Sequence, residues 1–270
     1  MTFYRRLLVF SLILLLAACK GGSNDVIVPT LADPQALQTA IVLTQNAPPP
    51  GFESAAFDPI DYNREKLPGV YFEVTVNFEG QYTATGEPAI GSMIIKVEEN
   101  NLMRTRRVIL QPVDTALSGN LTEVEAVRFS NDFYIVDKLS SICTKNNDSA
   151  VQIASLNAAN IVGGFTLALP TGRKDLINGY QSYQYGFARE NLTVNIFSTA
   201  PSAVEINGGE VWILPDFGVV GRFGVAMTVH NAKILFGSEP VTGILRYEYN
   251  LYTIYSDSST VPNIAIPNGC

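Results

Sequence analysis

The sequence predicts a mainly β protein, built on an antiparallel sheet of about ten strands with few helices. From Tyr71 onward, apolar and polar side chains alternate along one short run after another, which is the period of a strand with one buried face. Turn residues such as Asn207-Gly208-Gly209 and Pro215-Asp216-Phe217-Gly218 separate these runs at hairpin-like intervals. Because the links are short, the strands favour an antiparallel meander over alternating strand–helix units.

The N-terminus predicts export and lipid attachment. Arg5 and Arg6 precede an apolar run from Leu7 to Leu16, which is shorter than the roughly 20 residues of a membrane span but suits a signal peptide. The run ends in Leu16-Ala17-Ala18-Cys19, which resembles the lipobox of bacterial lipoproteins, whose Cys takes a diacylglyceryl group. We therefore predict a signal peptide over residues 1–18 and a lipidated Cys19. The alternative is an ordinary secretory signal with a chance Cys.

The charge of the chain excludes some classes of partner. Residues 1–18 carry two arginines and no acid, so the mature chain has 16 basic and 25 acidic residues and a net charge of −9. This balance argues against a nucleic-acid partner and against broad adhesion to anionic lipid. Charged residues make up only 16% of the sequence, where about 25% is usual. Either the core is large or some apolar surface has a role.

The predicted domain organisation is a tether followed by one domain. Residues 19–30 contain Gly, Ser and Asn and read as a flexible tether, and residues 31–270 form a single β domain. Asp33 and Pro34 are suitable N-cap and first residues for an amphipathic helix near 34–46. A Pro-containing stretch then leads to about Gly69. A second helix is expected from Ser149 to about Ile161, where the chain is rich in Ala and lacks alternation.

The expected strands begin with Tyr71–Phe78, in which Phe72, Val74, Val76 and Phe78 share one face. The others are Gly91–Val97, Met103–Leu110, Glu123–Phe129, Phe133–Val136, Phe165–Leu169 (followed by a turn at Pro170-Thr171-Gly172), Tyr183–Phe187, Leu192–Phe197, Glu210–Leu214, Val219–His230 and Thr242–Tyr255.

The last two long strands predict a sheet that is apolar on one side. Phe223, Val225 and Met227 alternate with polar or small residues, and Leu245, Tyr247, Tyr249 and Leu251 alternate with Arg246, Glu248 and Asn250. The apolar side needs a cover, and two short helices are little cover for ten strands. A curved sheet with a ligand cavity under its helices fits this shortage. The alternative is a sheet that folds over on itself as a fully packed sandwich.

The three cysteines suggest one lipid site and one disulfide. After Cys19, the remaining Cys143 and Cys270 most simply pair in an oxidising compartment, which would pin the C-terminal tail to the middle of the chain. Two free thiols or an intermolecular bridge are the alternatives.

Residues suited to catalysis or metal binding are scarce. The single histidine, His230, falls on the polar face of a strand, and no Gly-x-Ser-x-Gly elbow is present. Glu98-Glu99 reads as an acidic pair near a turn, and Asn146-Asn147-Asp148-Ser149 as a turn and helix N-cap. We therefore expect no enzyme, no metal and no cofactor, with a hydrolase that uses paired carboxylates as the remaining alternative.

One basic cluster stands out against the negative net charge. It consists of Arg104, Arg106 and Arg107. We expect a solvated strand face there, with contact to lipid headgroups as the other interpretation.

Several short stretches occur in a characteristic order after the predicted lipobox. They are Leu43-Thr44-Gln45, Pro49-Pro50-Gly51-Phe52, Tyr71–Val76, Gly209-Glu210-Val211-Trp212-Ile213, Val241–Ile254 and Ile264-Ala265-Ile266-Pro267. With them the chain resembles the broad LolA/LolB and mycobacterial LppX/LprG-like group of envelope proteins, in which a Tyr-rich closing strand precedes a short link and Ile-x-x-Pro. The resemblance covers most of residues 70–268 as a pattern; Cys143, Cys270 and the Pro-rich stretch depart from it.

The resemblance implies a curved antiparallel half-barrel with helices on its concave side and a hydrophobic cavity that carries acyl chains. It implies no catalytic residues. We therefore expect a lipid-anchored envelope protein, on the outer side of the plasma membrane or on an outer membrane, that binds a lipid or an acylated ligand. The alternative is a non-catalytic surface lipoprotein that acts as an assembly or interaction partner of another envelope protein. The candidate cavity residues are Phe72, Val74, Val76, Phe78, Phe223, Val225, Met227, Tyr247 and Tyr249.

Overall fold

The computed structural model describes residues 67–165, 167–187, 189, 192–193 and 204–270. The chain divides into two units, Met1–Thr44 and Gln45–Cys270, and all of the described residues belong to the second. The signal peptide, the lipidated Cys19, the tether and the helix near 34–46 lie outside the described residues, so they stay predictions, as does the single domain over 31–270.

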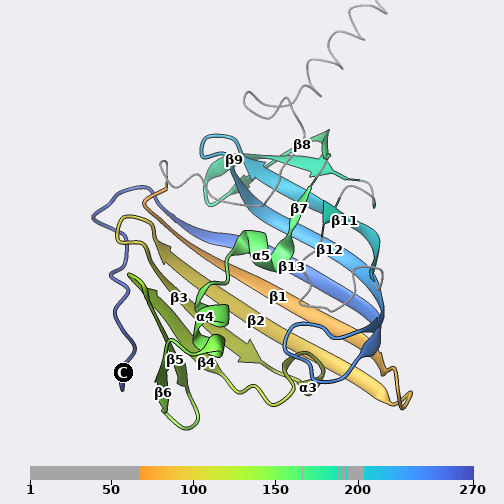
Figure 1. Cartoon of the computed structure of the whole chain (residues 1–270). Helices are drawn as coiled ribbons and strands as arrows, with labels where there is room; N and C mark the ends of the chain where they lie inside the picture. The colour runs from red at the N-terminus through yellow and green to blue at the C-terminus, as the bar shows by residue number, and fades with distance from the viewer. Residues whose placement is uncertain (1–66, 166, 188, 190–191, 194–203) are drawn as a thin grey trace, which may run out of the picture. The chain divides into compact units, whose positions relative to one another are not determined.

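The described residues form one curved, open antiparallel sheet of 11 strands, which confirms the predicted fold class (Figure 1). The strand order is β6-β5-β4-β3-β2-β1-β13-β12-β11-β9-β8. The strands are β1 (Gly69–Tyr82), β2 (Pro88–Asn100), β3 (Thr105–Pro112), β4 (Val124–Phe129), β5 (Asp132–Asp137), β6 (Cys143–Lys145), β8 (Leu169–Ile177), β9 (Tyr180–Gly186), β11 (Val204–Leu214), β12 (Val219–Ala232) and β13 (Val241–Tyr255). A separate two-stranded sheet pairs β7 (Gly164–Phe165) with β10 (Leu192–Thr193).

The centre of the sheet is made by strands from opposite ends of the described chain. β1 lies between β2 and β13, and its register with β13 runs from Gly69 opposite Tyr255 to Tyr82 opposite Val241. The meander β2–β6 extends the sheet to one side of this pair, and β12, β11, β9 and β8 extend it to the other. The longest strands are therefore central, where each gains hydrogen bonds from two neighbours.

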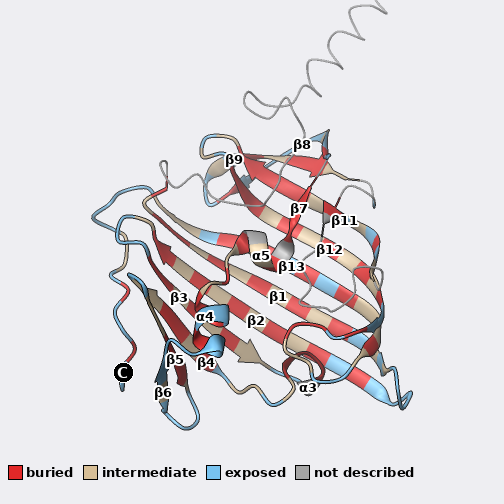
Figure 2. Ribbon diagram, viewed as in Figure 1, coloured by how far each residue is buried: buried red, intermediate tan, exposed pale blue. Residues whose placement is uncertain are grey.

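Burial alternates along the central strands with a period of two, as the sequence predicts. Figure 2 shows the result as bands of buried and half-buried residues across β1, β12 and β13. We call the side that carries the buried residues the inward face, and the opposite side the outer face. The inward face belongs to one continuous core cluster that also includes residues of the helices.

Three short helices pack over the inward face (Figure 1). They are α3 (Thr115–Ser118) against β2, α4 (Asp148–Ala154) against β3, β4 and β5, and α5 (Ala158–Val162) against β13. The single helix expected from Ser149 to Ile161 is thus two helices. The backbone N–H groups of Asn157 and Asn160 each donate to the other residue's side-chain oxygen, at 2.6 and 2.8 Å, and this reciprocal cap starts α5 separately.

One strand boundary and two turns differ from the expected ones. β3 begins at Thr105 and not at Met103, because the side chain of Asn100 accepts from the Met103 N–H at 2.9 Å and holds a turn there. The Asn207-Gly208-Gly209 segment is not a turn but lies inside β11, where the register shifts between Ile206 and Gly208. The turn expected at Pro170-Thr171-Gly172 lies inside β8, next to a register shift between Pro170 and Lys174.

The other expected strands agree in position with small differences at their ends. β6, β8 and α3 were not expected, and of Leu192–Phe197 only β10 lies within the described residues. In Phe165–Leu169, Phe165 ends β7 and Leu169 begins β8. The turn at Pro215–Gly218 is confirmed, with the Gly218 N–H donating to the Leu214 carbonyl at 2.9 Å.

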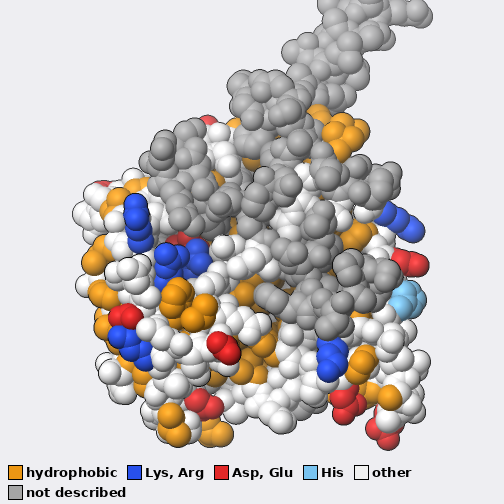
Figure 3. Space-filling view, in the orientation of Figure 1, with side chains coloured by type: hydrophobic (Ala, Val, Ile, Leu, Met, Phe, Trp, Pro, Cys, Tyr) orange, Lys and Arg blue, Asp and Glu red, His pale blue; other side chains and the backbone are white. Residues whose placement is uncertain are grey.

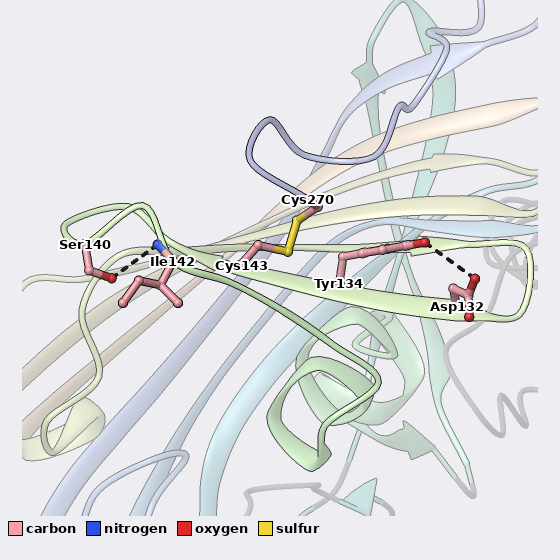
Figure 4. The surroundings of a disulfide bond; sticks show 6 residues. All are labelled: Asp132, Tyr134, Ser140, Ile142, Cys143 and Cys270. Carbon is pink, nitrogen blue, oxygen red and sulfur yellow. Dashed lines mark hydrogen bonds between the residues drawn. A yellow bond between two sulfur atoms is a disulfide. The ribbon is translucent and has the colours of Figure 1, made fainter.

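The predicted disulfide between Cys143 and Cys270 is confirmed (Figure 4). It joins β6 to the C-terminal segment, of which Ala265–Asn268 lie beside the outer-face side chains Arg107, Glu125 and Lys138. Ile264 in this segment is fully buried. The bridge therefore fastens a C-terminal strap to the outer face of one side of the sheet.

A close approach of β1 to β13 gives a test of the sheet. Gly80 and Gly243 are partners in the register, and a Cβ on Gly243 would lie 2.4 Å from the Glu79 carbonyl oxygen and 2.6 Å from the Gly80 Cα. We expect Gly243→Ala to lower the free energy of unfolding by about 1–3 kcal/mol through overpacking. The control is Gly224→Ala in β12, where the nearest atom would be 3.9 Å away. Equal stability of the two variants in urea unfolding would contradict this packing.

Candidate functional site

The nine candidate cavity residues come together on the inward face. β1, β13 and β12 are neighbours, so Val76 pairs with Tyr247 and Tyr247 pairs with Val225, while Tyr249 stands between Val74 and Phe223. All nine side chains belong to the core cluster, and none is more than 4% exposed. Their place in one contiguous apolar patch follows from the strand pairing. Their role as the lining of a cavity stays a prediction.

Two aromatic residues that were not among the candidates extend this patch. The Phe165 ring in β7 lies 5.4 Å from the ring of Phe223 and 4.8 Å from that of Phe187, which follows β9. Phe72 and Tyr249 are also in ring contact, at 5.1 Å between centroids. The sequence signal for Phe165 was present in its apolar run, but its contact with Phe223 depends on how the chain returns over the sheet.

One polar atom is buried in the apolar patch without a partner. The Tyr247 hydroxyl has no hydrogen-bond partner among the described residues, and burial raises the pKa of this phenol far above its usual value. The neighbouring Tyr249 hydroxyl donates a long hydrogen bond, 3.4 Å, to the Val220 carbonyl. A buried hydroxyl that makes no hydrogen bond costs about 1–3 kcal/mol, so Tyr247 marks a position where an added acceptor would be stabilised.

A row of charged side chains closes one end of the inward face. Along β2, β3 and β4, Glu99, Arg106 and Arg128 continue the alternation of the buried residues Val97, Val108 and Ala126. The three charged residues are also neighbours across the strands, because Glu99 pairs with Arg106 and Arg106 with Arg128. The apolar face therefore ends in a polar, mostly basic row.

The central member of this row is deeply buried. The Arg106 Nε lies 2.7 Å from the Glu99 carboxylate, and both side chains are less than a tenth exposed. A terminal nitrogen of the Arg106 guanidinium also donates to the carbonyl of Ser155, the C-cap of α4, at 3.0 Å. This contact ties the charged row to the helical cover.

The expectation of a solvated basic strand face is wrong for Arg106. Successive residues of a strand point to opposite sides, so Arg106 faces inward while Arg107 faces outward and pairs with Glu98 at 3.2 Å and Glu125 at 3.5 Å. Arg104 is exposed in the β2–β3 turn with a φ of 54°. The acidic pair is divided in the same way, with Glu99 inward and Glu98 outward.

The charged row lines a pocket of about 340 Å³ at the β2–β3 turn. Figure 3 shows Lys and Arg side chains gathered on this side of the molecule, above the position of α4 in the view. The pocket is lined by Glu99, Asn100, Asn101, Arg104, Thr105, Arg106 and Arg128.

The described part of the chain shows neither a metal-binding cluster nor a membrane-spanning helix. Within it, no three His, Cys, Asp or Glu side chains gather as they would around a metal ion. His230 is exposed near the end of β12. None of the helices in the described ranges is long and apolar enough to cross a membrane.

No family model matches the sequence, and no curated protein matches it. Among solved structures, the chain is similar to an uncharacterized conserved protein from Thermus thermophilus, with 11% identity, a TM-score of 0.28, and coverage of 86% of this chain and 96% of that one. It is also similar to a LolA superfamily protein from Nitrosomonas europaea, with 10% identity, a TM-score of 0.26, and coverage of 74% and 94%. A DUF1329 family protein from Desulfovibrio piger has 9% identity, a TM-score of 0.26, and coverage of 74% and 93%.

The structural neighbours thus include a member of the group that the short sequence stretches resemble. With identities near a tenth and TM-scores below 0.3, these matches contribute nothing to the assignment of a ligand.

Proposed function

We propose that this protein is a non-catalytic, lipid-anchored component of the cell envelope that binds the acyl chains of a lipid or an acylated protein. Cys19 carries the anchor, which holds the protein on the outer side of the plasma membrane or on an outer membrane. The acyl chains lie against the inward face of β1, β12 and β13. The activity is binding and delivery, without a chemical step on the ligand.

The observation that supports this proposal most is the length and continuity of the apolar inward face. The central strands β1, β2, β12 and β13 are 13 to 15 residues long, and their inward-facing apolar side chains belong to one continuous core cluster. A ligand placed between sheet and cover gains about 0.8 kcal/mol for each methylene removed from water. A chain of a dozen or more methylenes therefore supplies enough free energy for tight binding without any polar contact.

The unpartnered hydroxyl of Tyr247 is a second support. In a fully packed apolar core, a phenylalanine would fill the same space without the cost of burying a hydroxyl that makes no hydrogen bond. In a lipid complex, an ester or amide carbonyl of the ligand accepts the hydrogen bond that the described residues leave unmade. This contact would set the depth of the ligand along β13.

Native mass spectrometry of the mature chain tests the proposal. The chain carries Cys19→Ser, so that it has no acyl group of its own, and spectra are recorded before and after organic extraction. We expect a bound mass of lipid size that is lost on extraction and regained on addition of phospholipid. A protein that is free of lipid and takes up none would overturn the proposal and favour the interaction-partner alternative.

A pair of adjacent substitutions separates a ligand cavity from a packed core. Val225 faces inward beside Tyr247, and Ala226 faces outward on the same strand. If the inward face holds a ligand, Val225→Phe keeps the extracted protein folded but lowers its lipid uptake severalfold, whereas Ala226→Phe leaves uptake unchanged. If the face is solidly packed, Val225→Phe instead destabilises the protein by about 1–3 kcal/mol, with no lipid to lose.

A further inference from the structure

The charged row suggests which class of lipid is bound, on the basis of the proposed function. We propose that the ligand is an amphiphile with an anionic headgroup, held by Arg106 and Arg128 in the pocket at the β2–β3 turn. Its acyl chains continue from there along the inward face. The headgroup chemistry is that of a phosphate, sulfate or carboxylate.

The position of the pocket supports this arrangement. Arg106 lies on the same face of β3 as Val108 and Leu110, and Arg128 lies on the same face of β4 as Ala126. Alternate residues of a strand are about 7 Å apart, so the basic groups are one step from the apolar surface. An amphiphile needs a polar surface for its headgroup directly beside an apolar surface for its acyl chains.

The charge of the pocket is positive in a chain that is negative as a whole. Three arginines, Arg104, Arg106 and Arg128, line it with one carboxylate, that of Glu99. Glu99 is paired with Arg106, and no ion pair is formed by Arg128 within the described ranges. The positive charge of Arg128 therefore faces the pocket without a paired carboxylate, and the exposed Arg104 adds a second positive charge.

One buried donor in the pocket wall lacks an acceptor. The Arg128 Nε is inaccessible to water and has no hydrogen-bond partner among the described residues. A buried donor at a charged group is costly to leave unpaired. An anionic oxygen in the pocket would accept from the Arg128 guanidinium, and guanidinium groups bind such oxygens with directed, often bidentate, hydrogen bonds.

A lipid-binding assay with matched headgroups tests the inference on the mature chain carrying Cys19→Ser. The probes are phosphatidylglycerol, phosphatidylcholine and diacylglycerol with identical acyl chains, and inorganic phosphate is tested separately. We expect phosphatidylglycerol to bind about tenfold more tightly than diacylglycerol, which lacks the phosphate, because one charge-assisted hydrogen bond has about this effect. The variant Arg128→Gln should lose most of this preference while still binding all three lipids.

The matched control is Arg107→Gln, which removes the same charge from the outer face of β3. It should keep the wild-type preference. Equal affinity of the wild type for all three lipids would overturn the headgroup inference but leave the proposed function standing, whereas no binding of any lipid would overturn the proposed function. Binding of inorganic phosphate that depends on Arg128, without any lipid preference, would identify a site for free anions and would also overturn the inference.

Discussion

Removal of the disulfide by the double substitution Cys143→Ser and Cys270→Ser is expected to lower the free energy of unfolding by about 5 kcal/mol. The two cysteines are 127 residues apart in sequence, so the bridge closes a long loop and removes much conformational freedom from the unfolded chain. In the folded state it also holds the C-terminal strap against the outer face, where Ile264 is fully buried.

Urea unfolding followed by tryptophan fluorescence measures this loss directly. The chain has one tryptophan, Trp212, which is buried in β11 and so reports on the sheet. A reducing agent should weaken the wild type by the same amount and leave the double variant unchanged. A loss of less than about 1 kcal/mol would mean that the strap contributes little to the stability of the sheet.

Arg106→Met is expected to destabilise the protein by about 3–5 kcal/mol, because it leaves the Glu99 carboxylate buried without its partner. The same substitution also removes the contact between the guanidinium and the Ser155 carbonyl. Arg107→Met, one residue away on the outer face, serves as the control. Its ion pairs are partly exposed, and we expect less than about 1 kcal/mol of change.

The double variant Glu99→Leu with Arg106→Met shows whether burial of an unpaired charge causes the loss. Replacement of both partners removes that charge, so urea unfolding should recover most of the stability lost in the single variant. A double variant that is as unstable as Arg106→Met would indicate that packing of the arginine stem, and not the charge pair, is the source.

The sequence predicts the sheet well wherever a strand has one buried face. The alternation of Phe72, Val74 and Val76 is local information, and it is repeated in the structure as alternating burial. β8 was not predicted, since most of its residues are exposed and no alternation of apolar and polar residues marks them. The Asn207–Gly209 segment has the composition of a turn, and only its pairing with β12 shows that it is a bulge within a strand.

The candidate site could be predicted only in part for the same reason. That Arg106 shares a face with Val108 and Leu110 was readable from the spacing along one strand. That Glu99 and Arg128 stand beside it depends on the registers of β2, β3 and β4, which no local pattern specifies. The basic cluster in the sequence, Arg104 to Arg107, therefore includes the buried Arg106 of the pocket wall. It does not include Arg128, which comes from another strand.

The most direct test of acyl-chain binding on the inward face uses a phospholipid with a photoreactive group in its acyl chain. After irradiation of the complex with the mature Cys19→Ser chain, mass spectrometry locates the cross-linked peptides. We predict cross-links on inward-facing residues of β1, β12 and β13, including Val225 and Tyr247, and their loss in Val225→Phe but not in Ala226→Phe. Cross-links confined to outer-face residues, or none above the level of unfolded protein, would contradict the proposed function.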